Sequence, residues 1–295
     1  MKKISLFLVL LLIIPAVSAE KCGITNFVSC IPEKISEYFL MLLNAPLIPF
    51  LALVQKLLAE PVSIKLFHGL WGIMVYVISL FYGLLFLFSG LNFIVSGYDA
   101  EKRAKAKEWL QNTLLMIFFV QASYLIYSLI NDVASLLAAG VINLIDVKFF
   151  LITVDNPVNL GLSIILALFY VLALTTTIIF LSLRYLLVAG GIVFFPIGLF
   201  LYFIPPLRDY GKLILNSLGI LIFIPFFVSL ELLIASKLME IDLFSNFKIL
   251  VMISGFTLVN LSMSFLLIFS LVKAAMSVLK SDVGMAVSAG IKYFK

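Results

Sequence analysis

The chain has 295 residues, of which 64% are hydrophobic and only 12% are charged, and its formal net charge at pH 7 is +5. Charged residues make up about a quarter of an ordinary soluble protein, so this composition excludes a soluble globular domain and predicts an all-α, polytopic membrane protein. The basic excess favours topology signals and lipid headgroup contacts over a nucleic-acid-binding surface. The reason is that the Lys and Arg residues lie at the ends of apolar stretches and are not interleaved with aromatic residues.

Residues 1–19 have the pattern of a secretory signal peptide. Two lysines precede an apolar core that is too short to span a membrane, and Val17-Ser18-Ala19 supplies small residues for cleavage. We therefore expect the mature N-terminus to lie outside the cytoplasm. Cys22 and Cys30, the only cysteines, follow in that oxidising compartment, and their short separation favours a local disulfide over free thiols or metal ligands.

Residues 20–66 are expected to form an extracytoplasmic, amphipathic segment that lies on the outer face or re-enters the membrane. Pro32, Pro46 and Pro49 interrupt its apolar pattern, and a proline inside a helix costs roughly 3 kcal/mol or more. An ordinary kinked span is the alternative. It would place the basic stretch after Gly97 outside, which conflicts with the positive-inside rule.

The membrane domain is expected to cover residues 67–280, ahead of a cytoplasmic tail at 281–295. Its first span, 67–95, has glycines that we expect to mark faces where helices pack closely. They are Gly69, Gly72, Gly83 and Gly90. The single histidine, His68, lies at the outer edge of this span, where a headgroup contact is more typical than catalysis.

The densest cluster of charge follows Gly97. Asp99 is placed to cap a helix that runs to about Ala139, and at about 1.5 Å per residue this helix would be roughly twice as long as the hydrocarbon core is thick. Its first turns must therefore project into the cytoplasm. They contain four cations that we call the cationic collar, formed by Lys102, Arg103, Lys105 and Lys107.

After an outer loop at 143–159, a span is expected over residues 160–183, followed by Arg184, which either reaches the interface or is buried at a helix junction. The next stretch, 186–206, predicts a broken, re-entrant segment that lines a cavity, because non-helical backbone at membrane depth needs protein or water to cover its polar groups. The residues that mark it, with the cation that follows, are Gly190, Gly191, Pro196, Pro205, Pro206 and Arg208.

Two further spans, 213–235 and 249–272, complete the domain. With a re-entrant segment the protein has five spans and most Lys and Arg residues fall inside, whereas six spans, the alternative, would place most of them outside. The positive-inside rule therefore favours five spans and a cytoplasmic C-terminus. Glu231 is the one acid at some depth, where it can pair with Arg184, reach the outer surface or belong to a polar pathway.

We expect no enzymatic activity and no cofactor. The sequence has no zinc-protease, nucleophile-elbow, phosphate-loop or dinucleotide motif, and its single histidine and loop-confined acids form no acid–base or metal constellation. A coupled carrier would usually need intramembrane carboxylates or broken helices in two matched halves.

The order of features over residues 67–280 resembles a known family. Arg184, the Pro196 stretch and Ile204-Pro205-Pro206-Leu207-Arg208, leading into residues 216–225, are similar to the polytopic inner-membrane component of type IV secretion systems. These are the TrbL/VirB-type conjugation proteins and their archaeal DNA-transfer relatives. The stretch from Ser96 to Lys107 also resembles the charged turn between the two apolar helices of small conjugative pilins.

The resemblance implies a channel or scaffold subunit in the inner or plasma membrane, within a machine that translocates DNA or protein. The implied partners are further copies of the chain, pilin-like and other secretion subunits and cytoplasmic ATPases, with nucleic acid as a candidate transported substrate and lipid around the spans. By position, the collar would face cytoplasmic partners. A passage or gate would be formed by Arg184, Gly190, Gly191, Pro196, Pro205, Pro206, Arg208 and Glu231. The alternatives are a small-molecule transporter or permease and a non-transporting structural subunit.

Overall fold

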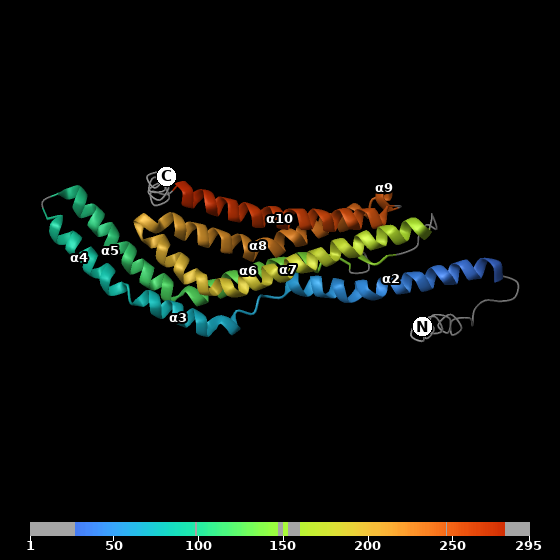
Figure 1. Cartoon of the computed structure of the whole chain (residues 1–295), viewed down its shortest axis with the longest axis horizontal. Coiled ribbons are helices and arrows are strands. Elements are labelled where there is room, and N and C mark those ends of the chain that lie inside the picture. The colour runs from blue at the N-terminus through green and yellow to red at the C-terminus, as the bar shows by residue number, and fades with distance from the viewer. Residues whose placement is uncertain (1–26, 98, 147–149, 153–159, 246, 281–295) are drawn as a thin grey trace, which may run out of the picture.

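The computed structural model describes residues 27–97, 99–146, 150–152, 160–245 and 247–280, and these form helices joined by short turns, with no β-strand among them (Figure 1). The described residues confirm the predicted all-helical fold, and five helical stretches are long and apolar enough to cross a membrane, which agrees with a multi-pass membrane protein. They are Lys65–Val95, Ser123–Ile142, Ile165–Phe203, Pro205–Leu238 and Lys248–Phe269. The predicted signal peptide, the tail at 281–295 and both side chains of the predicted Cys22–Cys30 disulfide lie outside the described part.

The centre of the bundle is an antiparallel helix pair. α7 (Leu160–Phe203) runs along the bundle, the one-turn helix η5 (Pro205–Leu207) reverses the chain, and α8 (Arg208–Leu238) returns beside α7. α10 (Lys248–Lys280) packs against both of these helices. α7 and α8 therefore take part in most of the interfaces of the bundle.

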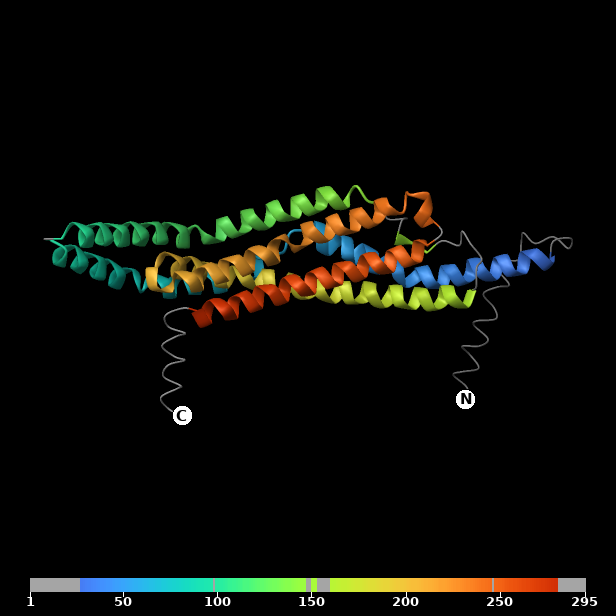
Figure 2. The ribbon, with the colours of Figure 1, turned by 90° about the horizontal axis from the view of Figure 1, so that it is seen from above.

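The remaining helices cover this pair. α6 (Ser123–Ile142) packs on α8, and α2 (Phe27–Ala59) and α3 (His68–Ser79) pack one after the other along α7 (Figures 1 and 2). The short helix α9 (Asp242–Ser245) joins α8 to α10 at the end opposite η5. One turn of 3-10 helix, η3 (Lys65–Phe67), leads into α3.

Two kinks lie where a hairpin leaves the bundle. The first span bends between α3 and α4 (Tyr82–Val95), and the second bends at Ala122, between α5 (Ala100–Gln121) and α6. The second helix is thus not continuous from Asp99 to Ala139 as expected. Beyond the kinks, α4 and α5 form a hairpin that projects past η5 and is inclined to the bundle axis (Figure 1).

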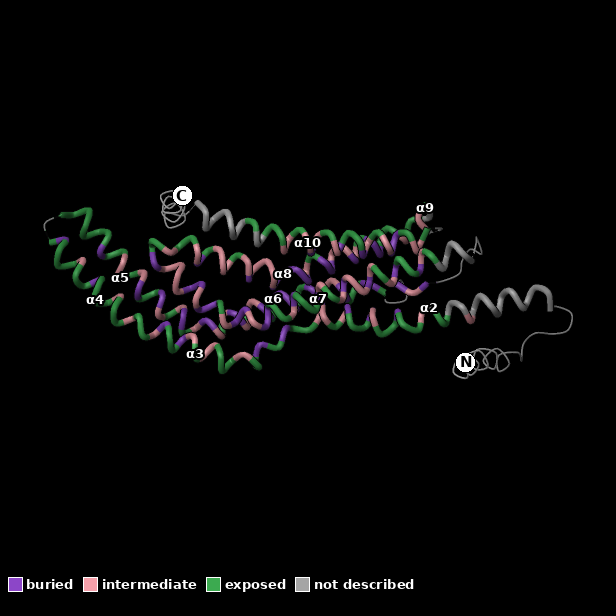
Figure 3. Tube along the Cα trace, viewed as in Figure 1, coloured by how far each residue is buried: buried purple, intermediate pink, exposed green. Residues whose placement is uncertain are grey.

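Burial is concentrated along the seams between helices, whereas the outer faces are apolar and exposed (Figure 3). One buried cluster joins α2, α7, α8 and α10 around Tyr170 and Phe256. A second joins α3, α5, α6, α7 and α8 around Tyr127 and Ile192. Large hydrophobic side chains on the outside are what a lipid environment requires and what composition predicts.

The segment expected to be broken by prolines is one helix, α2, that packs lengthwise on the bundle. Its buried residues recur at helical spacing, at Leu47, Leu51, Val54 and Leu58. The reason the prolines are tolerated is visible at Pro46, which like Pro49 lies on the exposed face, so that the missing backbone donor falls on the side away from the packed interface.

The prediction of a broken, re-entrant segment at 186–206 is wrong. α7 is a single helix of 44 residues that includes the glycine pair and Pro196, and the chain reverses only at η5. In an apolar medium every unpaired backbone group is expensive, so the helix continues wherever neighbours can pack against it. Pro196 is buried among such neighbours and does not end the helix.

Candidate functional site

The hairpin tip begins with the helix cap that the sequence predicts. The Asp99 carboxylate accepts hydrogen bonds from the backbone N–H of Glu101, at 2.9 Å, and of Lys102, at 3.4 Å. The Arg103 guanidinium donates to the backbone carbonyl of Gly97 and closes the turn from the other side. These bonds satisfy the first donors of α5 and fix the direction in which the helix leaves the turn.

The seam between α4 and α5 is narrow. Small buried side chains line it, and Phe88 packs edge-on against Trp109 with ring centroids 5.1 Å apart. The small residues are Ser89, Ser96, Ala106 and Thr113. Close approach of the two helices holds the hairpin together without large core residues, and it leaves the opposite face of α4 uncovered.

The cationic collar is partly neutralised by its own helix. Residues 99–108 hold four cations and three acids, which leaves a net charge of +1. Lys105 pairs with Glu101 at 2.7 Å, and Lys102 lies 3.9 Å from Asp99. The hydrogen bond from Lys105, together with its charge, lowers the pKa of Glu101, and the same bond raises the pKa of Lys105. All four collar residues are exposed, but their combined field on an anionic partner is weaker than the sequence suggests.

The four glycines of the first span do not pack against the rest of the chain. A Cβ atom built on any of them meets nothing within 4 Å, and this is the least buried of the five candidate spans. We expected Gly69, Gly72, Gly83 and Gly90 to mark helix-packing faces, and within this chain they do not. The outer face of α3 and α4 is therefore open to lipid or to another protein.

The residues expected to line a passage are instead packed together. A Cβ on Gly191 would lie 2.5 Å from the Tyr127 hydroxyl and 2.6 Å from Leu218, so Gly191 is a contact point between helices. The Tyr127 hydroxyl donates to the Val188 carbonyl at 2.6 Å, which fixes α6 against α7. Gly190 lies beside it, half-buried. This part of α7 is a close-packed interface.

The other passage residues are spread over the bundle. Pro205 and Pro206 are exposed in η5, and the Arg208 guanidinium lies over the Tyr202 ring at 5.2 Å, a cation–π contact at the end of the bundle. The structure does not gather them with Glu231, which lies near the other end of α8. The eight residues named for a passage or gate therefore do not surround one opening.

Arg184 is buried between α7 and α8, with 4% of its surface exposed. Its Nε donates to the Leu221 carbonyl at 2.9 Å, and its Nη2 donates to the Ile222 carbonyl at 3.0 Å. Pro225 has no backbone N–H, so the Leu221 carbonyl, four residues earlier, lacks its normal helical donor. The arginine supplies that missing donor. Arg184 was expected either to reach the membrane interface or to be buried at a helix junction, and the structure shows that it is buried.

Glu231 does not pair with Arg184. Its half-buried carboxyl group faces α10, where Oε2 lies 2.9 Å from the Ser262 hydroxyl. Two residues earlier on α10, about half a helical turn away, the Asn260 amide donates to the Ala173 carbonyl, and its carbonyl oxygen accepts from Thr177, both at 2.9 Å. Polar bonds thus join α10 to α8 on one side and to α7 on the other.

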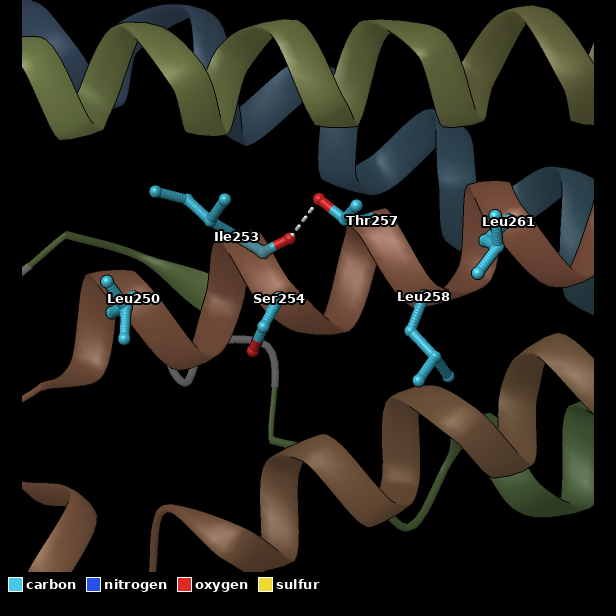
Figure 4. Close-up of a pocket in the computed structure, with 6 residues that line it drawn as sticks. All are labelled: Leu250, Ile253, Ser254, Thr257, Leu258 and Leu261. Carbon is cyan, nitrogen blue, oxygen red and sulfur yellow. Dashed lines mark hydrogen bonds between the residues drawn. The ribbon is translucent and has the colours of Figure 1, made fainter.

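A shallow apolar hollow lies on the outer face of α10 (Figure 4). Its two hydroxyls are turned back to their own helix: Thr257 donates to the Ile253 carbonyl at 2.7 Å, and Ser254 to the Val251 carbonyl at 2.9 Å. The other lining residues are Leu250, Leu258 and Leu261. With no polar group directed into it, the hollow suits a lipid chain better than a polar ligand.

Within the described residues, no three His, Cys, Asp or Glu side chains gather in a way that could hold a metal ion. His68 is exposed and contacts aromatic rings, at 5.4 Å from Trp71 and 4.9 Å from Tyr124. The Trp71 indole donates to the Ser123 hydroxyl at 2.8 Å, beside the kink at Ala122. This cluster ties the first span to the second.

Sequence reasoning missed the partners of Arg184 and Glu231, the two ionisable residues that stood out in the apolar runs. Ser262 was not expected to meet Glu231, and no sequence signal marks it. The sequence did contain a signal for the Arg184 contact. Pro225 inside a predicted helix indicates a backbone carbonyl without its helical donor, and Arg184 is a side chain that could donate to it. Comparison with models of known families, with curated proteins and with solved structures gave no match.

Proposed function

We propose that this chain is a non-enzymatic subunit of a multi-component machine of the type IV secretion or conjugation kind, which moves DNA or protein across the inner or plasma membrane. The observation that supports the proposal is that the exposed apolar surface of the helices extends over a greater length than the hydrocarbon core of one bilayer can cover. The residue pattern over 67–280 that resembles the polytopic component of these systems gives the proposal its direction.

The excess is clearest on α7 and α4. Large exposed hydrophobic side chains line α7 from Ile165 to Phe194, and α4 adds more as far as Val95, beyond the end of α7. At about 1.5 Å per residue, the α7 stretch alone is roughly 45 Å long, against a hydrocarbon core of about 30 Å. An average tilt of about 20° shortens this only slightly. The surplus surface requires a protein cover, as in a subunit of a larger assembly.

The distribution of cations supports a cytoplasmic location for the hairpin tip. The tip, η5 and the C-terminal end of α10 lie at the same end of the molecule (Figure 1). That end holds the collar, Arg208 and Lys212, whereas Lys237 and Lys248 lie at the other end. By the positive-inside rule, this arrangement favours a cytoplasmic C-terminus and five passes.

Replacing the four collar residues together by glutamine is expected to scramble insertion, because the largest group of retained cations is lost. The measurement is labelling from outside of a cysteine placed at Ser288, in a chain without Cys22 and Cys30. The unchanged collar should give no labelling, and the variant should give strong labelling. Lys237→Gln with Lys248→Gln is the control and should leave insertion unchanged. Normal insertion of the collar variant with loss of complex assembly would make the collar a docking surface instead.

A photo-cross-linking residue at Leu87, on the exposed face of α4, is expected to form an adduct with another protein in native membranes. Leu87 is 62% exposed and belongs to the face that the chain leaves uncovered. Leu258, in the hollow on α10, is 53% exposed and is the matched control; it should give mainly lipid adducts. Analysis by mass spectrometry identifies the partner. Only lipid adducts at both positions would contradict the proposal and favour a permease that acts alone.

A further inference from the structure

The contact between Glu231 and Ser262 brings a carboxyl group to a hydroxyl that also has a backbone acceptor. Glu231 lies seven residues before the end of α8, about 10 Å along the helix, and its Oε2 is 2.9 Å from the Ser262 hydroxyl oxygen. The same hydroxyl oxygen is 3.0 Å from the Val259 carbonyl oxygen. Three oxygens therefore meet in two short contacts.

One hydroxyl proton cannot serve both contacts. A carbonyl and an ionised carboxylate only accept hydrogen bonds, so the Ser262 proton would leave one of the two oxygen pairs without a hydrogen between them. A neutral carboxyl group supplies the second proton. Glu231 then donates to the Ser262 oxygen, and Ser262 donates to the Val259 carbonyl. With the proton on Glu231, both contacts are ordinary hydrogen bonds.

On the other side of α10, the Thr177 hydroxyl likewise lies near two acceptor oxygens. Thr177 donates to the Asn260 carbonyl oxygen, and the Asn260 amide donates to the Ala173 carbonyl. The Thr177 hydroxyl is also 3.0 Å from the Ala173 carbonyl, which already receives the amide proton. Two acceptors around one hydroxyl are therefore not particular to Ser262. What distinguishes the Ser262 contact is that one of its two acceptors is an ionisable carboxyl group, which can carry a proton of its own.

The charged groups on the helices packed around α8 are engaged elsewhere or lie far along their helices. Arg184 donates to the Leu221 and Ile222 carbonyls, and Lys248 begins α10 about 21 Å from Ser262 along the helix. On α8 itself, Lys237 pairs with Glu240. Several other titratable groups on these helices are bonded locally: Lys56 with Glu60 on α2, Asp132 with Ser128 and Tyr127 with Val188 on α6, Tyr170 with Phe150 on α7, and Lys212 with Asp209 at the far end of α8.

We propose that Glu231 is a proton-binding site in the membrane bundle, which retains its proton near neutral pH and joins α8 to α10 as a hydrogen-bond donor. An ionised carboxylate with one hydroxyl partner would be unfavourable at this depth. The neutral group satisfies its own donor and gives α10 a polar bond to each neighbour. The site makes Glu231 reactive toward hydrophobic carbodiimides, which require a protonated carboxyl group in an apolar surrounding.

The test is labelling of the full chain, in detergent micelles near neutral pH, with dicyclohexylcarbodiimide. The carboxyl proton moves to a carbodiimide nitrogen, the carboxylate oxygen bonds to the central carbon, and the acyl group then migrates to nitrogen to give a stable N-acylurea. The Glu231 peptide therefore gains the mass of the whole reagent. We expect labelling to fall as the pH is raised, and the exposed Glu240 to stay unlabelled by this reagent. An unlabelled Glu231, or labelling only by a water-soluble carbodiimide, would overturn the proposal.

Variants give an independent readout. Glu231→Gln keeps a neutral group that can donate to Ser262, so it should lose the label and unfold at the same temperature as the unsubstituted chain. Glu231→Ala removes the donor and should unfold at a lower temperature. If Glu231→Gln lowers the unfolding temperature as much as Glu231→Ala does, the ionised form is the native one and the proposal is wrong.

Discussion

Replacing Arg184 by alanine is expected to lower the free energy of unfolding by about 3 kcal/mol, which combines a buried acceptor left without a donor and a cavity between α7 and α8. The Leu221 carbonyl has no helical donor because Pro225 stands four residues later, so loss of the Arg184 Nε leaves it unpaired. Unfolding of the chain in mixed micelles, followed by tryptophan fluorescence, measures the change. Arg184→Lys should also destabilise the protein, because one ammonium group does not reproduce the geometry of the two guanidinium bonds.

A double-substitution cycle separates this role from simple packing. Pro225→Ala restores a backbone N–H opposite the Leu221 carbonyl, so Arg184→Ala should cost less in the Pro225→Ala background than in the native one. The expected coupling is about 1 kcal/mol, the net contribution of one hydrogen bond. Additive effects of the two substitutions would show that Arg184 does not serve the carbonyl freed by the proline.

Gly211→Ala is expected to destabilise the protein by about 3 kcal/mol, because the new methyl group would collide with backbone rather than with a movable side chain. It would overlap the Tyr202 nitrogen and lie 2.5 Å from the Tyr202 Cα and 2.7 Å from the Gly198 carbonyl. To relieve this clash, α8 would have to move away from α7 next to η5. A fall in unfolding temperature and increased protease sensitivity at η5 are the readouts.

Gly219→Ala on the same helix is the matched control. A Cβ atom there meets nothing within 4 Å, and replacing a helical glycine by alanine is worth about 0.5–1 kcal/mol of added stability. The two glycines thus predict opposite signs for the same substitution. Equal effects at Gly211 and Gly219 would refute the close packing of α7 against α8.

The all-helical class and the number of helices long enough to cross a membrane could be predicted, because they depend on composition and on the length of apolar runs. The Asp99 cap could be predicted because a cap is a local bond between a side chain and the next turn. The continuous helix at 186–206 could not be predicted. Gly190, Gly191 and Pro196 favour a break in a helix when local sequence alone is considered, and the sequence does not show which helices pack against them. In the fold, Tyr127 fills the space over Gly191, and the helix continues.

The candidate sites were predicted in part. Arg184 and Glu231 stood out in the sequence as rare charges in apolar runs, but their partners are a backbone carbonyl and a serine hydroxyl, which have no distinctive pattern. The same limit applies to glycine. Gly69 and Gly211 are indistinguishable in sequence, yet one faces open space and the other touches backbone. Only the arrangement of helices separates these cases.

The kinks between α3 and α4 and at Ala122 lie where the α4–α5 hairpin leaves the bundle, so the hairpin projects as an arm from the bundle surface. At the base of the hairpin, the rings of Phe81 and Phe119 meet Phe200 and Phe203, near the end of α7, at centroid distances of 6.0 and 5.6 Å. These rings therefore connect the base of the hairpin to the η5 end of α7, about 24 Å along that helix from Arg184.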